Sequence, residues 1–151
     1  MGKGQPQGRS FREFEIGQKF TTAARTITEA DIVSFAGLSG DYNPMHIDEE
    51  FARGSVFGER IAHGLLAVSA VSGFLYRSDI TSMSGPILGL NWQFKKAIKI
   101  KDTIYAKVVV SEKRESKSLK GQGIITFDIT IYNQREEVAQ KGELTVMMPL
   151  E

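Results

Sequence analysis

The longest apolar stretch of the chain runs from Ile61 to Tyr76 and contains no charged residue, with Arg60 and Arg77 on either side. As an α-helix it would be about 24 Å long at 1.5 Å per residue. Apolar or small residues occupy every face of that helix, which predicts that it is buried nearly all round. A membrane span needs about 20 strongly apolar residues. This stretch is shorter and carries His63, two glycines and two serines, so we interpret it as a core helix.

After this stretch the chain changes to an alternation of apolar and polar residues, which is typical of β-strands. The pattern predicts four strands, over residues 86–96, 103–115, 122–133 and 137–148. The third strand shows the alternation clearly, with apolar residues at Ile125, Phe127, Ile129 and Ile131 and polar ones at Thr126, Asp128 and Thr130. The connections between these strands are short and rich in turn residues, which predicts antiparallel pairing.

The first half of the chain predicts shorter elements. Residues 1–10 are rich in Gly, Pro and Gln and are expected to form a flexible tail. A short strand is expected around residues 19–25. Thr28 has the side chain of a helix N-cap and acidic residues follow it, so a helix is predicted from there to Gly40. A second short helix is expected to start near Asp48.

These elements predict the fold class. A chain of 151 residues fits one domain, which we place at residues 11–151. One strand, then helices, then a run of long strands predict an α+β architecture, in which an antiparallel sheet curls around the buried helix. Such a sheet leaves a face or an edge that needs cover, and a homo-oligomer is one solution.

Charge and cysteine content exclude several classes of protein. Nineteen basic and 18 acidic residues give a net charge of +1. The chain therefore lacks the excess of positive charge that is typical of nucleic-acid-binding proteins. The chain has no cysteine and only two histidines. A disulfide scaffold, a thiol nucleophile, a cysteine-ligated metal and a His-rich metal site are therefore excluded. Residues 1–10 lack the apolar core of a signal peptide, so a soluble, cytoplasmic protein without a membrane partner is expected.

The segment between the two predicted helices concentrates residues that suit acid–base chemistry. Pro44 disfavours a helical conformation at Asn43, so the chain turns there and brings Asp41 and His46 close together. A carboxylate and an imidazole in this arrangement can hold one water and move its protons. The amide of Asn43 offers a donor and an acceptor to the same pocket. Asp and Asn in turns also often only cap the backbone, and a lone His is often structural.

The start of the apolar stretch is a second candidate. Free N–H groups at a helix N-terminus can stabilise an oxyanion, and Gly64 would let a carbonyl group approach the backbone closely. The alternative for Gly64 is tight helix packing. We interpret His63 as structural. Ser69 and Ser72 lie on one side of the helix, where each hydroxyl can bond to a helix carbonyl, and no nucleophile-elbow motif precedes either of them.

Two segments together resemble a known family. The sequence GDYNPMHID at 40–48, followed by RIAHGLL at 60–66 and by residues 69–73, closely resembles the MaoC-like dehydratase family. The chain is most similar to the short, single-domain (R)-specific enoyl-CoA hydratases, from about residue 14 to residue 149. The resemblance implies a hot-dog fold, in which a curved antiparallel sheet wraps a long helix, and a homodimer.

The resemblance also implies a reaction and a set of site residues. The reaction is the reversible hydration of a 2-enoyl-CoA to the (R)-3-hydroxyacyl-CoA, with coenzyme A as part of the substrate and no metal or redox cofactor. Asp41 and His46 fall on the catalytic Asp and His of the family, and Asn43 falls on the supporting Asn. Gly64 falls on the glycine of the oxyanion hole, and Ser72 on a serine that lies near the active site in relatives.

Three other activities remain open on the sequence. The first is a dehydratase that acts on a thioester linked to acyl-carrier protein. The second is a hot-dog thioesterase, which hydrolyses the thioester, and the third is a non-catalytic protein that only binds it. The Asp41 and His46 pair argues against a thioesterase, which commonly uses one acidic residue. A basic cluster could meet the phosphates of coenzyme A, but we interpret it as a solvated strand edge; it consists of Lys95, Lys96, Lys99 and Lys101.

Overall fold

The alternating segments assemble into one antiparallel sheet in the computed structural model, which describes residues 8–81 and 85–151. Four long strands follow one another in sequence: β3 (Ile87–Phe94), β4 (Thr103–Glu115), β5 (Gln122–Tyr132) and β6 (Val138–Pro149). The strand order is β1-β4-β5-β6-β3, so β3 lies at one edge and the short β1 (Lys19–Thr21) at the other. The four strands predicted from the alternation are confirmed to within about two residues.

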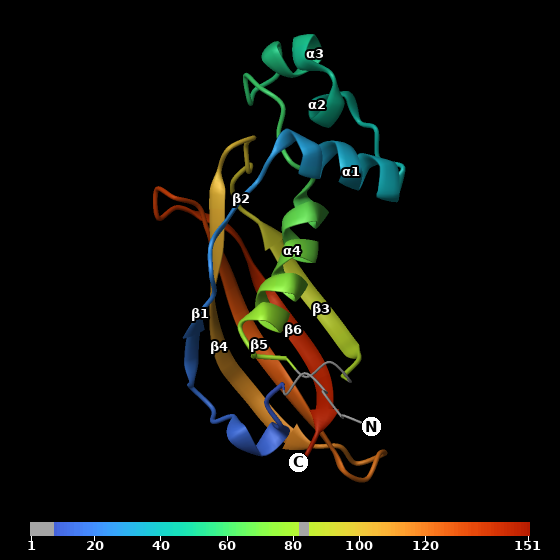
Figure 1. Cartoon of the computed structure of the whole chain (residues 1–151), viewed down its shortest axis with the longest axis vertical. Helices are drawn as coiled ribbons and strands as arrows, with labels where there is room; N and C mark the ends of the chain where they lie inside the picture. Colours follow the sequence, from blue (N-terminus) through green and yellow to red (C-terminus); the bar gives the residue numbers. More distant parts are fainter. Residues whose placement is uncertain (1–7, 82–84) are drawn as a thin grey trace, which may run out of the picture.

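Helix α4 (Gly64–Arg77) lies against one face of this sheet (Figure 1). Leu66, Val71 and Phe74 on the helix are buried against the inward residues of the strands. Those strand residues include Ile104, Ala106, Val108, Val110, Phe127 and Ile129, none of them more than 1% exposed. A helix held by an antiparallel sheet confirms the α+β prediction and is the hot-dog arrangement that the resemblance implies.

The apolar stretch differs from its prediction in two respects. Its first residues are extended rather than helical, because Ile61 bridges to Lys99 and the N–H of Ala62 donates to Ile98 O at 2.7 Å. The helix is also not buried nearly all round. Leu65 is 59% exposed and Tyr76 46% exposed, since the sheet of a single chain covers only one side of α4.

The N-terminal elements cover the far edge and one end of the sheet. Helix η1 (Phe11–Glu13) is capped by Ser10, and Arg9 donates to the carbonyl of Asp79. These two residues, assigned to the tail by sequence, are thus held against the domain, while residues 1–7 lie outside the described part of the chain. The predicted strand 19–25 is split into β1 and β2 (Arg25–Thr26), both paired with β4.

Three short helices lie together beyond one end of the sheet, near the start of α4 (Figure 1). They are α1 (Glu29–Ser39), α2 (Pro44–Ile47) and α3 (Glu49–Arg53). The predicted cap of α1 is confirmed, because the Thr28 side chain accepts from the N–H of Asp31. Helix α2 was not predicted; Pro44 occupies its first position, where a missing N–H costs nothing. Within residues 8–81 and 85–151, no helix is long and apolar enough to cross a membrane.

Candidate active site

The loop between α1 and α2 is fixed by short-range hydrogen bonds. Gly40 ends α1 in the left-handed conformation, with φ of 75°. The N–H of Asn43 donates to Asp41 Oδ1 at 3.2 Å, and the N–H of Met45 donates to Asn43 Oδ1 at 3.0 Å. Asn43 therefore caps α2 with its oxygen, which leaves only its amide nitrogen to donate to a ligand.

His46 is buried and its ring orientation is set by the backbone. Its Nδ1 lies 2.8 Å from the carbonyl oxygen of Ile61. Because a carbonyl only accepts, Nδ1 carries the proton and Nε2 presents a lone pair. That Nε2 lies 4.0 Å from Asp41 Oδ2, and the Asp41 side chain is 53% exposed. The separation is too long for a direct hydrogen bond, and one water can bind to both groups.

His63 joins the loop to the start of α4. Its Nε2 lies 2.9 Å from the backbone carbonyl of Asp41, so this nitrogen donates. Its ring stacks on His46 with centroids 3.8 Å apart, and Phe35 packs on it at 5.0 Å. These contacts agree with the structural role assigned to His63 from the sequence.

Three donor groups lie close enough together to be considered for a metal. One atom each of Asp41, His46 and His63 lies within 4.8 Å of the others. The two rings are stacked with an angle of 29° between their planes, and each ring already bonds a backbone carbonyl, through His46 Nδ1 and His63 Nε2. A tetrahedral ion needs converging ligands, and the arrangement suits a proton-transferring pair better than a metal site.

Gly64 begins α4 and lines a cavity of about 410 Å³ together with His46, Phe94 and Ile98. The first N–H groups of a helix have no partner within the helix, so the N–H of Gly64 suits an oxyanion. A Cβ at this position would lie 2.7 Å from Phe94 Cε1. A side chain at position 64 would therefore displace the Phe94 ring, at the same position whose N–H suits an oxyanion.

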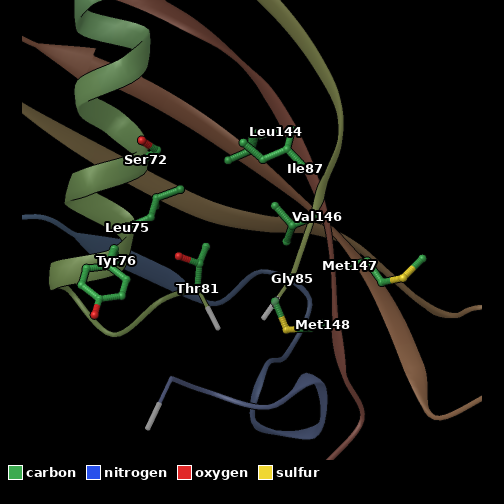
Figure 2. Close-up of a pocket in the computed structure, with 10 residues that line it drawn as sticks. All are labelled: Ser72, Leu75, Tyr76, Thr81, Gly85, Ile87, Leu144, Val146, Met147 and Met148. Atoms are coloured by element: carbon green, nitrogen blue, oxygen red, sulfur yellow. The ribbon is translucent and has the colours of Figure 1, made fainter. Parts of the chain in front are cut away.

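Ser72 lies elsewhere. It is eight residues beyond Gly64 on α4, which is about 12 Å along the helix axis, and its hydroxyl donates to Ser69 O at 2.7 Å. Figure 2 shows Ser72 and Leu75 on α4 facing Leu144 and Val146 on β6, in a pocket of about 200 Å³. The structure brings Asp41, Asn43, His46 and Gly64 to one end of α4 but not Ser72, whose role stays a prediction.

The pocket of Figure 2 continues along α4 into a second apolar pocket. A further pocket of about 250 Å³, lined by Val68, Leu90 and Trp92 among others, shares Ser72, Ile87 and Leu144 with the pocket of Figure 2. We call this succession the α4 groove; it is lined by Val68, Ser72, Leu75, Leu90, Trp92 and Leu144. Its lining is mostly apolar, which suits a hydrocarbon chain.

Charged residues clamp the loop and the cavity wall. Arg60, with its side chain 12% exposed, binds Glu29 on α1 at 2.7 Å and Glu49 on α3 at 3.1 Å. The hydrogen bond to Glu29 raises the pKa of Arg60 above its ordinary value. This clamp holds α1 and α3 on either side of the candidate catalytic loop.

The second charged cluster supports the cavity wall at Lys96. Glu137 binds the ammonium of Lys96 and the guanidinium of Arg135. Hydrogen bonds from Asn133, Lys96 and Arg135 lower the pKa of Glu137 to about 2. Glu137 therefore stays ionised through neutral and mildly acidic pH.

Two residues that the sequence analysis left out of the site also line the cavity. Lys95 and Gln140 both face it, from the loop after β3 and from β6. The strand pattern in the sequence indicates Gln140, because this residue is in phase with the apolar residues Leu144 and Val146. In the structure Gln140 is only 2% exposed. A polar residue in a core-facing register usually has a specific partner.

A helix held in a curved antiparallel sheet, with an Asp and His pair beside the N-terminus of that helix, defines a hot-dog protein with a candidate acid–base site. The model of the MaoC-like domain matches residues 12–129. The chain therefore belongs to the MaoC-like domain family.

Named relatives agree with this assignment over nearly their whole length. The (R)-specific enoyl-CoA hydratase of Rhodospirillum rubrum is 37% identical over 142 residues, covering 92% of this chain and 91% of that protein. The protein of the same name from Aeromonas caviae is 34% identical over 140 residues, covering 93% of this chain and 99% of that protein. A solved (R)-hydratase structure from Pseudomonas aeruginosa has a TM-score of 0.82 at 30% identity. The match covers 98% of this chain and 90% of that chain. These names are those of hydro-lyases.

The contact between Gly64 and Phe94 gives a stability prediction. Gly64→Ala places a methyl group against the Phe94 ring and is expected to lower the free energy of unfolding by about 1–3 kcal/mol, as overpacking does. Gly37→Ala is the matched control, because its Cβ would meet only Tyr42 Oη at 3.7 Å and alanine favours a helix by about 1 kcal/mol. Urea denaturation at one protein concentration measures both. Equal stability of the two variants would show that Gly64 is not required for packing.

Proposed function

We propose that this protein catalyses the reversible hydration of a 2-enoyl-CoA to the (R)-3-hydroxyacyl-CoA. The observation that carries the proposal is the separation of 4.0 Å between His46 Nε2 and Asp41 Oδ2, beside a cavity that the first residue of α4 also lines. A proton-transferring pair and a backbone donor are the two parts that addition of water to an unsaturated thioester needs. The membership of the family and the names of the relatives support the same reaction class.

The proposed chemistry uses one water and no redox step. The N–H of Gly64 donates to the thioester carbonyl and stabilises the negative charge that develops on its oxygen. One O–H bond of the water held by Asp41 and His46 breaks, and its hydroxyl group forms a bond to the β-carbon. The proton passes through the pair to the α-carbon, so that the elements of water are added across the double bond. We propose that no metal or redox cofactor takes part.

The roles of the pair follow from their surroundings. His46 holds its Nδ1 proton against Ile61 O, so only Nε2 can exchange a proton with the water. Asp41 is the more exposed of the two groups and is bonded by the N–H of Asn43. We assign Asp41 as the main base and His46 as its acid–base partner.

The α4 groove is proposed to receive the acyl chain. Its apolar lining extends from Val68 past Ser72, so burial of methylene groups there is favourable by about 0.8 kcal/mol each. Lys95 and Lys96 lie at the other side of the cavity. Lys96 is paired with Glu137, so we propose that Lys95 meets the phosphates of coenzyme A.

The test of the reaction follows the loss of enoyl-CoA absorbance with crotonyl-CoA and with a longer enoyl-CoA, while free thiol and product chirality are measured in parallel. The (R)-hydroxy product without free thiol is expected, with turnover of both chain lengths. Release of free thiol would replace the proposal with a thioesterase. No reaction with either substrate would favour a carrier-protein substrate or a binding role.

Removal of either member of the pair is expected to abolish most turnover. Asp41→Asn and His46→Gln should each lower kcat by about 100-fold or more, the usual contribution of a general acid or base, with circular dichroism unchanged. Glu50→Gln is the control, because this exposed carboxylate pairs with Arg53 on the same short helix. Full activity of either site variant would refute the assignment.

Lys95 gives a prediction that separates coenzyme A from other thioester carriers. Lys95→Gln is expected to raise KM for crotonyl-CoA about three- to fivefold, the effect of one partly exposed charge pair. The KM for crotonyl-pantetheine, which lacks the nucleotide phosphates, should not change. Lys117→Gln, in the exposed turn after β4, is the control. An unchanged KM for crotonyl-CoA would support the interpretation of this cluster as a solvated strand edge.

We also propose a homodimer that joins the β3 edges of two chains. β3 is the last strand of the sheet, and its unpaired backbone groups and exposed apolar side chains need cover. The exposed side chains at this edge include Leu65, Ile87, Leu90 and Phe94, each between 50% and 59% exposed. A second copy would bury them and the open side of α4.

Light scattering is expected to give the mass of two chains. Leu90→Glu should shift the protein toward a single-chain mass, because a charge would be buried at the joint. Leu119→Glu is the matched control, since Leu119 is 52% exposed and lies in the turn before β5. A single-chain mass for the unchanged protein would overturn the proposal.

A further inference from the structure

Trp92 and Gln140 form a hydrogen-bonded chain that ends on the backbone of Gly64. Trp92 Nε1 donates to Gln140 Oε1 at 2.9 Å. Gln140 Nε2 donates to the carbonyl oxygen of Gly64 at 3.0 Å. The chain joins β3, β6 and the first residue of α4, and Gln140 is only 2% exposed.

The orientation of the Gln140 amide is determined by its two partners. An indole N–H can only donate and a backbone carbonyl can only accept. With the amide turned over, its nitrogen would face the Trp92 N–H and its oxygen would face the Gly64 carbonyl, so both hydrogen bonds would be lost. A buried amide without partners costs about 1–3 kcal/mol, and this penalty keeps Gln140 in one orientation.

The neighbouring residues make room for this chain. Gly142 lies opposite Trp92 in the register of β3 and β6. A Cβ on Gly142 would lie 2.5 Å from Trp92 Cε3, so the indole ring can lie over the sheet only because this residue is glycine. Phe94, opposite Gln140, packs against the Cα of Gly64 from another side. Gly64 is thus held both by a ring against its Cα and by a donor on its carbonyl.

We infer that Gln140, supported by Trp92, is a positioning residue that sets the direction of the Gly64 N–H. A glycine at the first position of a helix has wide conformational freedom and lacks the hydrogen bonds of the helix interior. The bond from Gln140 to the Gly64 carbonyl fixes the peptide unit between Gly64 and Leu65. The Phe94 ring packed against Gly64 limits rotation about the N–Cα bond, so the two contacts together restrain the N–H. Stabilisation of an oxyanion depends on donors fixed in place before the reaction, and a misplacement of about 1 Å can cost 100-fold in rate.

This inference rests on the proposed function, in which the N–H of Gly64 binds the thioester carbonyl. Gln140→Leu keeps a side chain of similar volume but removes both hydrogen bonds. It is expected to lower kcat at least about tenfold and to change KM for crotonyl-CoA less than twofold, because the coenzyme contacts remain. Trp92→Phe keeps a ring over Gly142 and removes only the donor, so a smaller fall in kcat is expected. Gln93→Leu, on the adjacent residue that faces the opposite side of the sheet, is the control.

The double variant and a spectroscopic signature separate positioning from a general loss of stability. Because Trp92 acts through Gln140, Trp92→Phe combined with Gln140→Leu should lower kcat no further than Gln140→Leu alone. The carbonyl stretch of ¹³C-labelled butyryl-CoA, which carries no double bond to hydrate, should shift to lower frequency on binding to the unchanged protein. This shift should be smaller with Gln140→Leu and unchanged with Gln93→Leu.

The outcomes distinguish the inference from the function on which it rests. If the unchanged protein hydrates enoyl-CoA while Gln140→Leu and Trp92→Phe keep its kcat and its carbonyl shift, the inference is overturned and the function stands. A rise in KM with unchanged kcat would show that Gln140 contacts substrate directly, which also overturns a positioning role. If the unchanged protein hydrates no enoyl thioester, the proposed function fails and the inference with it. If Gln140→Leu does not fold, Trp92→Phe gives the test alone.

Discussion

The hydrogen bond from the His63 ring to the backbone carbonyl of Asp41 connects two segments that are 22 residues apart. The loop supplies the carboxylate and the imidazole, and α4 supplies the glycine N–H. The His63 ring also stacks on His46, so it supports the second residue of the proposed pair. His63 contributes no reacting atom in the proposed chemistry, yet the distance between the pair and the helix terminus depends on where this ring sits.

That ring is well placed because the element behind it is rigid. Buried side chains anchor α4 along its length, with Ala67, Val71 and Phe74 each at most 2% exposed, so the first turns of the helix as well as the last are packed in the core. The loop is less deeply anchored and relies on polar contacts, above all the clamp of Arg60 on Glu29 and Glu49. Groups on a rigid scaffold hold catalytic geometry better than groups on loops, and the chain attaches its loop directly to the scaffold.

Local sequence patterns predicted the strands and helix caps, which depend on residues close together in the chain. The alternation at Ile125 to Ile131 gave the strand, and the side chain of Thr28 gave the helix cap. The extended start of the apolar stretch escaped prediction because Ile61 bridges to Lys99, a contact that apolar periodicity does not encode. The exposed side of α4 was not predicted either. Apolar periodicity predicts that a face of the helix is covered, but it does not say whether the same chain covers it. Asp41, His46 and Gly64 were proposed from loop and helix-end chemistry and from the family resemblance. The alternation of β6 places Gln140 on the inward face, but its partners Trp92 and Gly64 follow only from the register of β6 against β3 and from the packing of α4.

Polar groups are concentrated at one end of α4, and apolar side chains predominate toward the other end. His46, Gln140 and the first turn of α4 gather at one end of the helix, and the groove toward Leu75 and Val146 is mostly apolar. A buried polar group is tolerated only where its partners are present, and Trp92 and Gly64 satisfy Gln140 without turning it into the groove. In the proposed reaction, a thioester carbonyl beside Gly64 would meet the N-terminus of α4, and an acyl chain that extends toward Leu75 and Val146 would meet mostly apolar side chains.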